Sequence, residues 1–194
     1  MTETNSHTPE QALETAKLGI WAFLATEVLL FGGLFTAYTV FRIGDPRMFH
    51  TEYLKLNRVF GAVNTVVLIC SSLTVAMGIA AIRQGKQRML RVCLSLTILL
   101  AVAFLGIKYV EYAEHLALGE LPGTNIFFSL YYTLTGLHAV HVAAGIAALA
   151  TMLVITRRGR FSAAYHNPVE ITGLYWHFVD LVWIYLFPLL YLIG

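Results

Sequence analysis

The chain has 194 residues, of which 58% are hydrophobic and only 12% are charged, and its mean hydropathy is +0.69. A soluble domain of this length has too small a core to bury so much apolar side chain, so the composition excludes an ordinary soluble enzyme and predicts a membrane protein. The net charge of +2 is small and gives no reason to expect nucleic acid as a partner.

Five segments are long and apolar enough to cross a bilayer, because a crossing helix needs about 20 residues at a rise of about 1.5 Å each. They are residues 18–41, 59–82, 92–112, 126–155 and 171–193. Residues 1–16 are polar and lack the basic start of a signal peptide, so we interpret them as a soluble tail. Residues 17–194 then form one membrane domain, and the predicted fold is an all-α, polytopic transmembrane bundle of five helices.

The positions of lysine and arginine predict the orientation of the bundle, since these cations stay on the cytoplasmic side when they lie in short loops. One side of the predicted bundle carries eight of them: Lys17, Arg83, Lys86, Arg88, Arg91, Arg157, Arg158 and Arg160. The other side carries four: Arg42, Arg47, Lys55 and Arg58. We therefore predict that the N-terminus is inside and the C-terminus outside.

Titratable residues inside the first and third spans need an explanation. A charge at membrane depth is expensive and is usually retained where it faces the bundle interior, is paired, or lines a path. Glu27 has no cation one turn away, which fits proton exchange, an anchor for a polar ligand, or a structural hydrogen bond. Lys108 and Glu111 are three residues apart on one helix, and this spacing predicts a structural ion pair.

The last two spans contain histidines at helical spacing. His138 and His141 are one turn apart, but a zinc or copper site needs further donors. The small residues after them favour close helix packing and interhelical hydrogen bonds, so we predict no metal site. His177 and Asp180 share one face of the last helix. We expect the carboxylate to support the histidine by hydrogen bonding, with both side chains facing protein.

Five motifs, one in each predicted helix, carry a family resemblance. In chain order they are KLGIWAFLATEVLLFGGLFTAY, GAVNTVVLICSS, KYVEY, TGLHAVHVAAG and YWHFVDLVW. The series resembles subunit III of the haem-copper oxidases in its short, five-helix bacterial form. The resemblance implies an accessory subunit of a respiratory terminal oxidase, which couples O2 reduction in aerobic electron transport to proton pumping. It also implies a location in the bacterial plasma membrane, packing against oxidase subunits I and II, and membership of a larger respiratory supercomplex in some cases.

The resemblance further implies how individual residues act. It assigns no catalytic residue and no cofactor to this chain, because haem and copper belong to the partner subunits, whereas phospholipid occupies a cleft. Glu27 matches a carbodiimide-reactive carboxyl linked to proton uptake and stability during turnover. Positions that match those shaping the cleft or joining the helices are His138, His141, Glu170, Tyr175, Trp176, His177 and Asp180. Leu174 and Lys108 depart from the Trp and Gln common in the family, and seven-helix relatives have two further helices at the N-terminus.

Alternative functions stay open from the sequence. An accessory subunit of a nitric oxide reductase would share these motifs, and the electron donor of an oxidase could be cytochrome c or quinol. A free-standing proton-coupled transporter would also place a glutamate and histidines inside the membrane. Such transporters usually have inverted repeats or broken helices, and neither is evident in this sequence.

Overall fold

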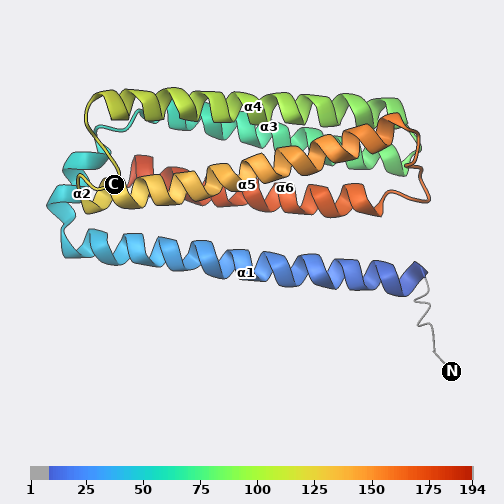
Figure 1. Cartoon of the computed structure of the whole chain (residues 1–194), viewed down its shortest axis with the longest axis horizontal. Helices are drawn as coiled ribbons and strands as arrows, with labels where there is room; N and C mark the ends of the chain where they lie inside the picture. Colours follow the sequence, from blue (N-terminus) through green and yellow to red (C-terminus); the bar gives the residue numbers. More distant parts are fainter. Residues whose placement is uncertain (1–8, 194) are drawn as a thin grey trace.

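The computed structural model describes residues 9–193, which form helices joined by short connections (Figure 1). The helices are α1 (Pro9–Gly44), α2 (Pro46–Tyr53), α3 (Arg58–Arg83), α4 (Gln87–Ala117), α5 (Ile126–Arg157), α6 (Asn167–Phe187) and a terminal π-helix, η1 (Pro188–Leu192). Five segments are long and apolar enough to cross a membrane: Glu14–Gly44, Arg58–Arg83, Gln87–Ala117, Ile126–Arg157 and Asn167–Leu192. The predicted all-α bundle with five spans is confirmed.

The ends of the helices differ from the prediction. α1 begins at Pro9, so residues 9–16 of the expected tail are helical, and residues 1–8 lie outside the described part of the chain. The sequence PEQALETAK explains this early start, because proline fits the first helical position and most of the other residues favour a helix. Hydropathy detects only the portion of a helix that lies in hydrocarbon, and it also misses the short amphipathic α2 in the first predicted loop.

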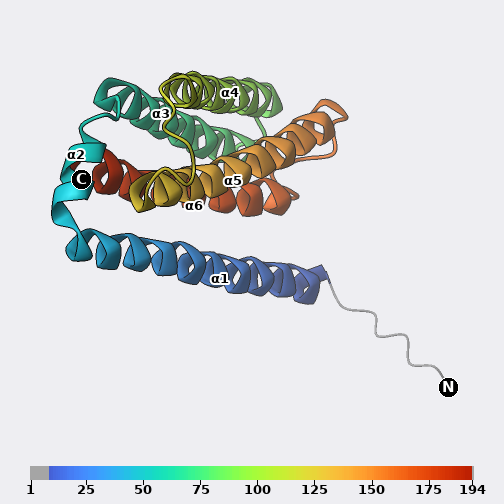
Figure 2. The same cartoon turned by 60° about the vertical axis from the view of Figure 1, so that its left-hand side comes forward.

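Four helices form the compact part of the bundle, and α1 lies along one side of it (Figures 1 and 2). α3 packs against α4 and α6, and α5 packs against α4 and α6, whereas α1 touches α5 and α6 more sparsely. In the most apolar stretch of α1, 11% is buried within the chain, against 50% for the span that contains α6. The start of α1 and the end of the chain lie at opposite ends of the molecule (Figure 1).

Glycine at three positions allows α6 and the chain after it to pack closely. A Cβ added to Gly145 of α5 would lie 2.7 Å from the Trp176 ring, and one added to Gly61 of α3 would lie 2.8 Å from Phe187. A Cβ on Gly173 of α6 would meet Ile79 at 2.5 Å. Real Cβ atoms do not approach other atoms so closely, so a side chain at Gly145 or Gly61 would displace an aromatic ring, whereas one at Gly173 would displace only the terminal methyl of Ile79. Gly145 belongs to the small residues of α5 that were expected to favour packing.

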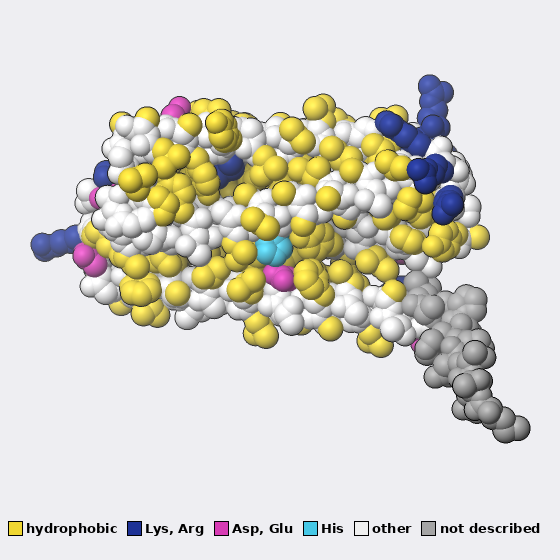
Figure 3. Space-filling model, in the orientation of Figure 1, with side chains coloured by type: hydrophobic (Ala, Val, Ile, Leu, Met, Phe, Trp, Pro, Cys, Tyr) yellow, Lys and Arg dark blue, Asp and Glu magenta, His cyan; other side chains and the backbone are white. Residues whose placement is uncertain are grey.

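α1 is anchored at its C-terminal end. The Tyr38 ring lies 5.2 Å from the Phe49 ring of α2, and Phe49 lies 5.6 Å from Phe127 of α5, both edge to face. The guanidinium of Arg42 donates a hydrogen bond to the backbone carbonyl of Ile193. On the face that Figure 3 shows, apolar side chains are spread along the length of the molecule, and most of the visible Lys and Arg lie toward its ends. This distribution suits a bundle that crosses a bilayer.

Candidate functional site

Glu27 of α1 and His141 of α5 meet within the membrane-spanning part of the bundle. The distance between Glu27 Oε2 and His141 Nε2 is 2.9 Å, and each side chain is 13% exposed. Figure 3 shows a histidine beside an acidic side chain midway along an apolar surface. Glu27 therefore has a partner 114 positions away in sequence, and His141 takes part in a polar contact between helices.

The other ring nitrogen determines how this pair holds its proton. His141 Nδ1 lies 2.8 Å from the carbonyl oxygen of Leu137, which can only accept, so we assign a hydrogen to Nδ1. His141 Nε2 then either accepts a hydrogen bond from a protonated Glu27 or carries its own proton and donates to the Glu27 carboxylate. Both arrangements contain one proton between the two atoms, and both leave the pair with no net charge.

Aromatic side chains surround this pair and orient it. The Tyr175 hydroxyl of α6 donates to the backbone carbonyl of His141 at 3.1 Å. The Phe31 ring lies 5.3 Å from the His141 ring in an edge-to-face arrangement, and the Phe23 ring lies 6.1 Å from that of Tyr175. The pair is thus held between α1, α5 and α6, and it keeps a small accessible surface.

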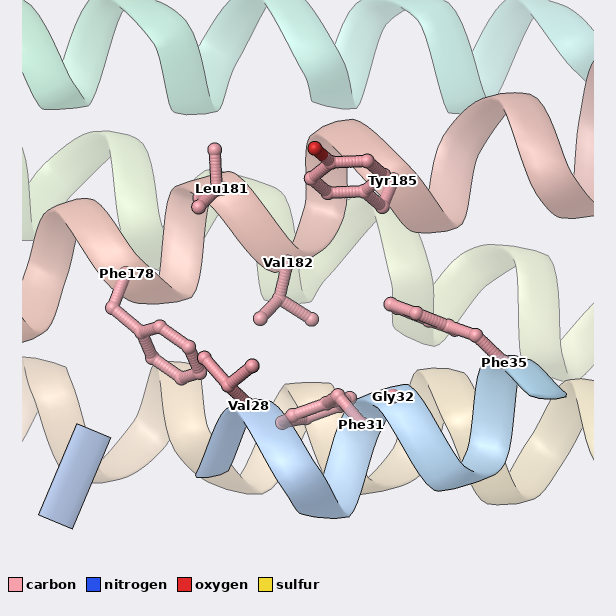
Figure 4. Close-up of a pocket in the computed structure, with 8 residues that line it drawn as sticks. All are labelled: Val28, Phe31, Gly32, Phe35, Phe178, Leu181, Val182 and Tyr185. Carbon is pink, nitrogen blue, oxygen red and sulfur yellow. The ribbon is translucent and has the colours of Figure 1, made fainter. Parts of the chain in front are cut away.

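An apolar groove runs between α1 and α6. It encloses about 310 Å³. Phe178 and Val182 of α6 point toward α1 in Figure 4, whereas Leu181 points away from it. Its lining residues carry no charge: Val28, Phe31, Gly32, Phe35, Phe178, Leu181, Val182 and Tyr185. Phe31 also contacts His141, so the groove adjoins the Glu27–His141 pair. A groove with such walls is suited to a hydrocarbon chain.

A second cavity of about 210 Å³ lies further along the same two helices, toward the start of α1. Unlike that of the apolar groove, its lining includes the charged and polar residues Lys17, Asn167 and Glu170, together with Ile20, Trp21, Ile171 and Leu174. The α1–α6 interface therefore combines an apolar middle with a charged end.

The expected hydrogen bond between His177 and Asp180 is not formed, and that prediction is wrong. His177 Nδ1 instead lies 2.6 Å from the Ser72 hydroxyl of α3. The two oxygens of Asp180 have no hydrogen-bond partner among the described residues, although Ser72 is close and the residue is only 3% exposed. Spacing of one turn allows such a bond but does not require it, because a hydroxyl on the neighbouring helix competes for the imidazole.

His177 and Asp180 do share a cavity of about 240 Å³ between α3 and α6. The other residues that line it are Leu68, Ile69, Ser72, Leu181 and Ile184. The pair of side chains thus belongs to the contact of α6 with α3, and the sequence did not reveal Ser72 as the partner. Ser72 was recognisable only as one of several hydroxyl residues on α3.

His138 is placed apart from His141. It is fully buried, and its ring lies 5.6 Å from Phe104 and 5.3 Å from Trp183. Neither ring nitrogen has a hydrogen-bond partner in the described part of the chain. The two histidines therefore do not converge on one ligand, and residues 9–193 show no group of three or more His, Cys, Asp and Glu arranged to hold a metal.

Trp176 and Glu170 connect α6 with α3. The Trp176 indole donates to the Ser71 hydroxyl at 3.0 Å, while its ring packs on Gly145 of α5. Glu170 accepts a hydrogen bond of 2.7 Å from Nε of Arg83, the last residue of α3. Glu170 also lies 3.1 Å from His166 Nε2. Trp176 and Glu170 therefore both join α6 to α3.

Lys108 and Glu111 form an ion pair of 2.8 Å, and it is deeply buried, with side-chain exposures of 4% and 1%. Lys108 Nζ also donates to the hydroxyls of Tyr131 at 3.0 Å and Tyr191 at 2.9 Å. Tyr191 in turn donates to Glu111 Oε1 at 2.6 Å. All three hydrogens of the ammonium group thus have an oxygen acceptor. The tyrosines come from α5 and η1, so their spacing in the sequence gives no sign of this network.

The five spans and the polar contacts held between them define a multi-pass membrane protein of the bundle type. The chain belongs to the family described as cytochrome c oxidase subunit III, whose pattern matches residues 2–194. It is therefore a subunit III of the haem-copper oxidase family, which associates in the membrane with other oxidase subunits.

Relatives from two kinds of oxidase resemble the chain to a similar degree. Cytochrome c oxidase subunit 3 of Thermostichus vulcanus is 37% identical over 177 residues, which are 91% of this chain and 86% of the relative. Cytochrome c oxidase subunit 3 of Synechocystis sp. is 39% identical over 176 residues, 90% of this chain and 74% of the relative. A probable quinol oxidase subunit 3 of Staphylococcus aureus is 36% identical over 185 residues, 93% of this chain and 90% of the relative.

Proposed function

We propose that the chain is the non-catalytic subunit III of a terminal oxidase in a bacterial plasma membrane, with its N-terminus in the cytoplasm. It packs against the catalytic subunit I, and haem and copper reside in the partner subunits. Its role is to support proton uptake and to protect the complex from inactivation during turnover. The observation that carries this proposal is the 2.9 Å contact between Glu27 Oε2 and His141 Nε2 at membrane depth beside an apolar groove.

The pair suits proton exchange because either tautomeric arrangement is neutral overall. A lone carboxylate or a lone imidazolium at this depth would carry the full cost of a charge in the membrane. Transfer of the proton between Glu27 Oε2 and His141 Nε2 crosses a single hydrogen bond of 2.9 Å. Both side chains keep some accessible surface, so a proton can reach the pair from outside the bundle.

The α1–α6 groove supports binding of a phospholipid. Its apolar middle fits an acyl chain, and the cavity with Lys17 and Asn167 offers a cation and an amide to a phosphate group. A lipid in this position would fill the space beside the sparsely packed α1. It would also cover the Glu27–His141 pair from one side, since Phe31 touches both the groove and the histidine ring.

The test compares Glu27→Gln with the unmodified protein in the purified complex. We expect a complex of normal composition, a near-normal initial rate of O2 reduction, faster inactivation during turnover, and loss of carbodiimide labelling of this subunit. Glu114→Gln is the control, because Glu114 is an exposed carboxyl on α4. Equal lifetimes of the two variants, or labelling that persists in Glu27→Gln, would contradict the proposed role. If no haem protein copurifies, the proposed role in a terminal oxidase complex fails, while membership of the subunit III family stands.

A further inference from the structure

The cavity between α3 and α6 contains a carboxyl group, that of Asp180, which makes no hydrogen bond within residues 9–193 although the Ser72 hydroxyl lies near it. Asp180 is 3% exposed, and neither of its oxygens has a hydrogen-bond partner. It lies halfway along the span Asn167–Leu192, so bulk water is distant on both sides. A buried polar group without a partner costs about 1 to 3 kcal/mol. The intact complex therefore has a reason to bring a hydrogen-bonding group to this position.

His177 adds a second polar group to the same cavity. Its Nδ1 is bonded to Ser72, whereas its other ring nitrogen has no hydrogen bond to any described residue. Two residues of the rim, Ile69 and Ile184, are 51% and 44% exposed, so the cavity opens on the outside of the bundle. Among residues 9–193 only the Ser72 hydroxyl lies near the Asp180 carboxyl, so a further hydrogen-bond donor would come from outside the described residues.

Lipid is a poor occupant of this position. The hydrocarbon core of a bilayer is about 30 Å thick, so phospholipid head groups lie on the order of 15 Å from its middle. Acyl chains have no hydrogen-bond donor to offer Asp180. A transmembrane helix can present a hydroxyl, amide, indole or ammonium group at any depth, and it is the occupant that the chemistry of the cavity favours.

The surface around the cavity consists of a ridge with a groove on either side, which is a shape suited to helix packing. Leu181, Ile184 and Tyr185 of α6 are 49%, 44% and 61% exposed. They form a ridge between the cavity on the α3 side and the apolar groove on the α1 side, and Leu181 lines both. Ridges and grooves of this kind receive the side chains of a neighbouring helix.

The outward face of α4 is different. Leu99 and Val102 are 64% and 52% exposed. The cavity between α4 and α3 is lined by Phe60, Ala103, Gly106, Ile107 and Val110, none of which has a side chain that forms hydrogen bonds. Hydrocarbon chains satisfy such a surface completely, so α4 provides a matched lipid-facing reference for the α3–α6 surface.

We propose that the α3–α6 face is the docking surface for a transmembrane helix of the haem-bearing partner subunit, which donates a hydrogen bond to Asp180. This inference rests on the proposed function, since it specifies how the chain meets its oxidase partner. The apolar α1–α6 groove then runs along the edge of the subunit interface. A lipid held there contacts both subunits.

Site-specific photo-crosslinking tests this surface. Benzoylphenylalanine would replace Leu181 or Ile184 on α6, and Leu99 or Val102 on α4 as the control. All four positions are exposed, so folding is preserved in each variant. After irradiation of membranes, we expect a covalent product with the haem-bearing subunit from the α6 positions and none from the α4 positions. The reverse pattern, or capture by neither helix while the haem subunit copurifies, would overturn the inference and leave the proposed function intact.

Substitution of Asp180 tests the hydrogen bond itself. Asp180→Leu removes the acceptor, whereas Asp180→Asn keeps one and preserves the shape of the side chain. We expect this subunit to dissociate from the complex about tenfold faster in Asp180→Leu and much less so in Asp180→Asn. Far-UV circular dichroism of each variant shows whether the bundle has folded. Unchanged dissociation of a folded Asp180→Leu would refute the assigned contact.

Discussion

Removal of one partner of the Lys108–Glu111 ion pair should destabilise the bundle more than removal of both. The two side chains are 4% and 1% exposed. Leaving one buried charge without its partner costs about 3 to 5 kcal/mol. We therefore expect Lys108→Met and Glu111→Gln each to lose about this much free energy of unfolding. The double variant leaves no buried charge and gives up mainly hydrogen bonds to Tyr131 and Tyr191, at about 1 kcal/mol each.

Thermal unfolding in a fixed concentration of detergent provides the assay, followed by circular dichroism. For a chain of this length, 1 kcal/mol shifts the Tm by about 2 to 4 °C, so each single variant should melt about 6 to 20 °C lower. Glu114→Gln on the same helix is the control, because Glu114 is exposed. If the loss in the double variant equals the sum of the two single losses, the charges act independently and the reasoning is refuted.

Three further predictions concern packing, capping and the helix ends. Gly145→Val should lower the free energy of unfolding by about 1 to 3 kcal/mol, because a Cβ there meets the buried Trp176 ring at 2.7 Å; unchanged thermal stability would contradict this contact. Asn57→Ala should cost about 1 kcal/mol, since the Asn57 side chain accepts hydrogen bonds from two backbone amides at the start of α3; an equal melting temperature would show that water replaces the cap. Arg83→Gln should change stability by less than about 1 kcal/mol, because the Arg83 side chain is 60% exposed; a large loss that persists in high salt would show that its ion pair with Glu170 is shielded.

Hydropathy was enough to locate the five spans, because a run of about 20 apolar residues in so uncharged a chain has few other uses. The ends of the helices were less predictable. Residues 9–17 and 113–117 continue α1 and α4 beyond the predicted spans, where polar residues with good helix propensity extend a helix past the hydrocarbon. Glycine gave clear stops after α3 and α5, where Gly85 and Gly159 adopt positive φ angles.

Most contacts between helices could not be predicted from the spacing of residues in the sequence. The same three-residue interval brings Lys108 and Glu111 together but leaves His177 and Asp180 apart. The difference lies in the neighbouring helix, which offers a hydroxyl to His177. Glu27 and His141 meet only because α1 lies against α5. A single sequence without its packing cannot give that juxtaposition.

The contacts of α1 have a consequence for the purified subunit. This helix is fastened at one end by Arg42 and by the aromatic contacts of Tyr38, while the apolar groove beside it has room for material from outside the chain. Protection of the α1 backbone amides from hydrogen exchange should therefore depend on bound lipid and on the partner subunits. In detergent without lipid, the first half of α1 should exchange faster than α3 to α6. Adding phospholipid and the partner subunits back should slow that exchange. The full stability of α1 is therefore expected only in the assembled complex.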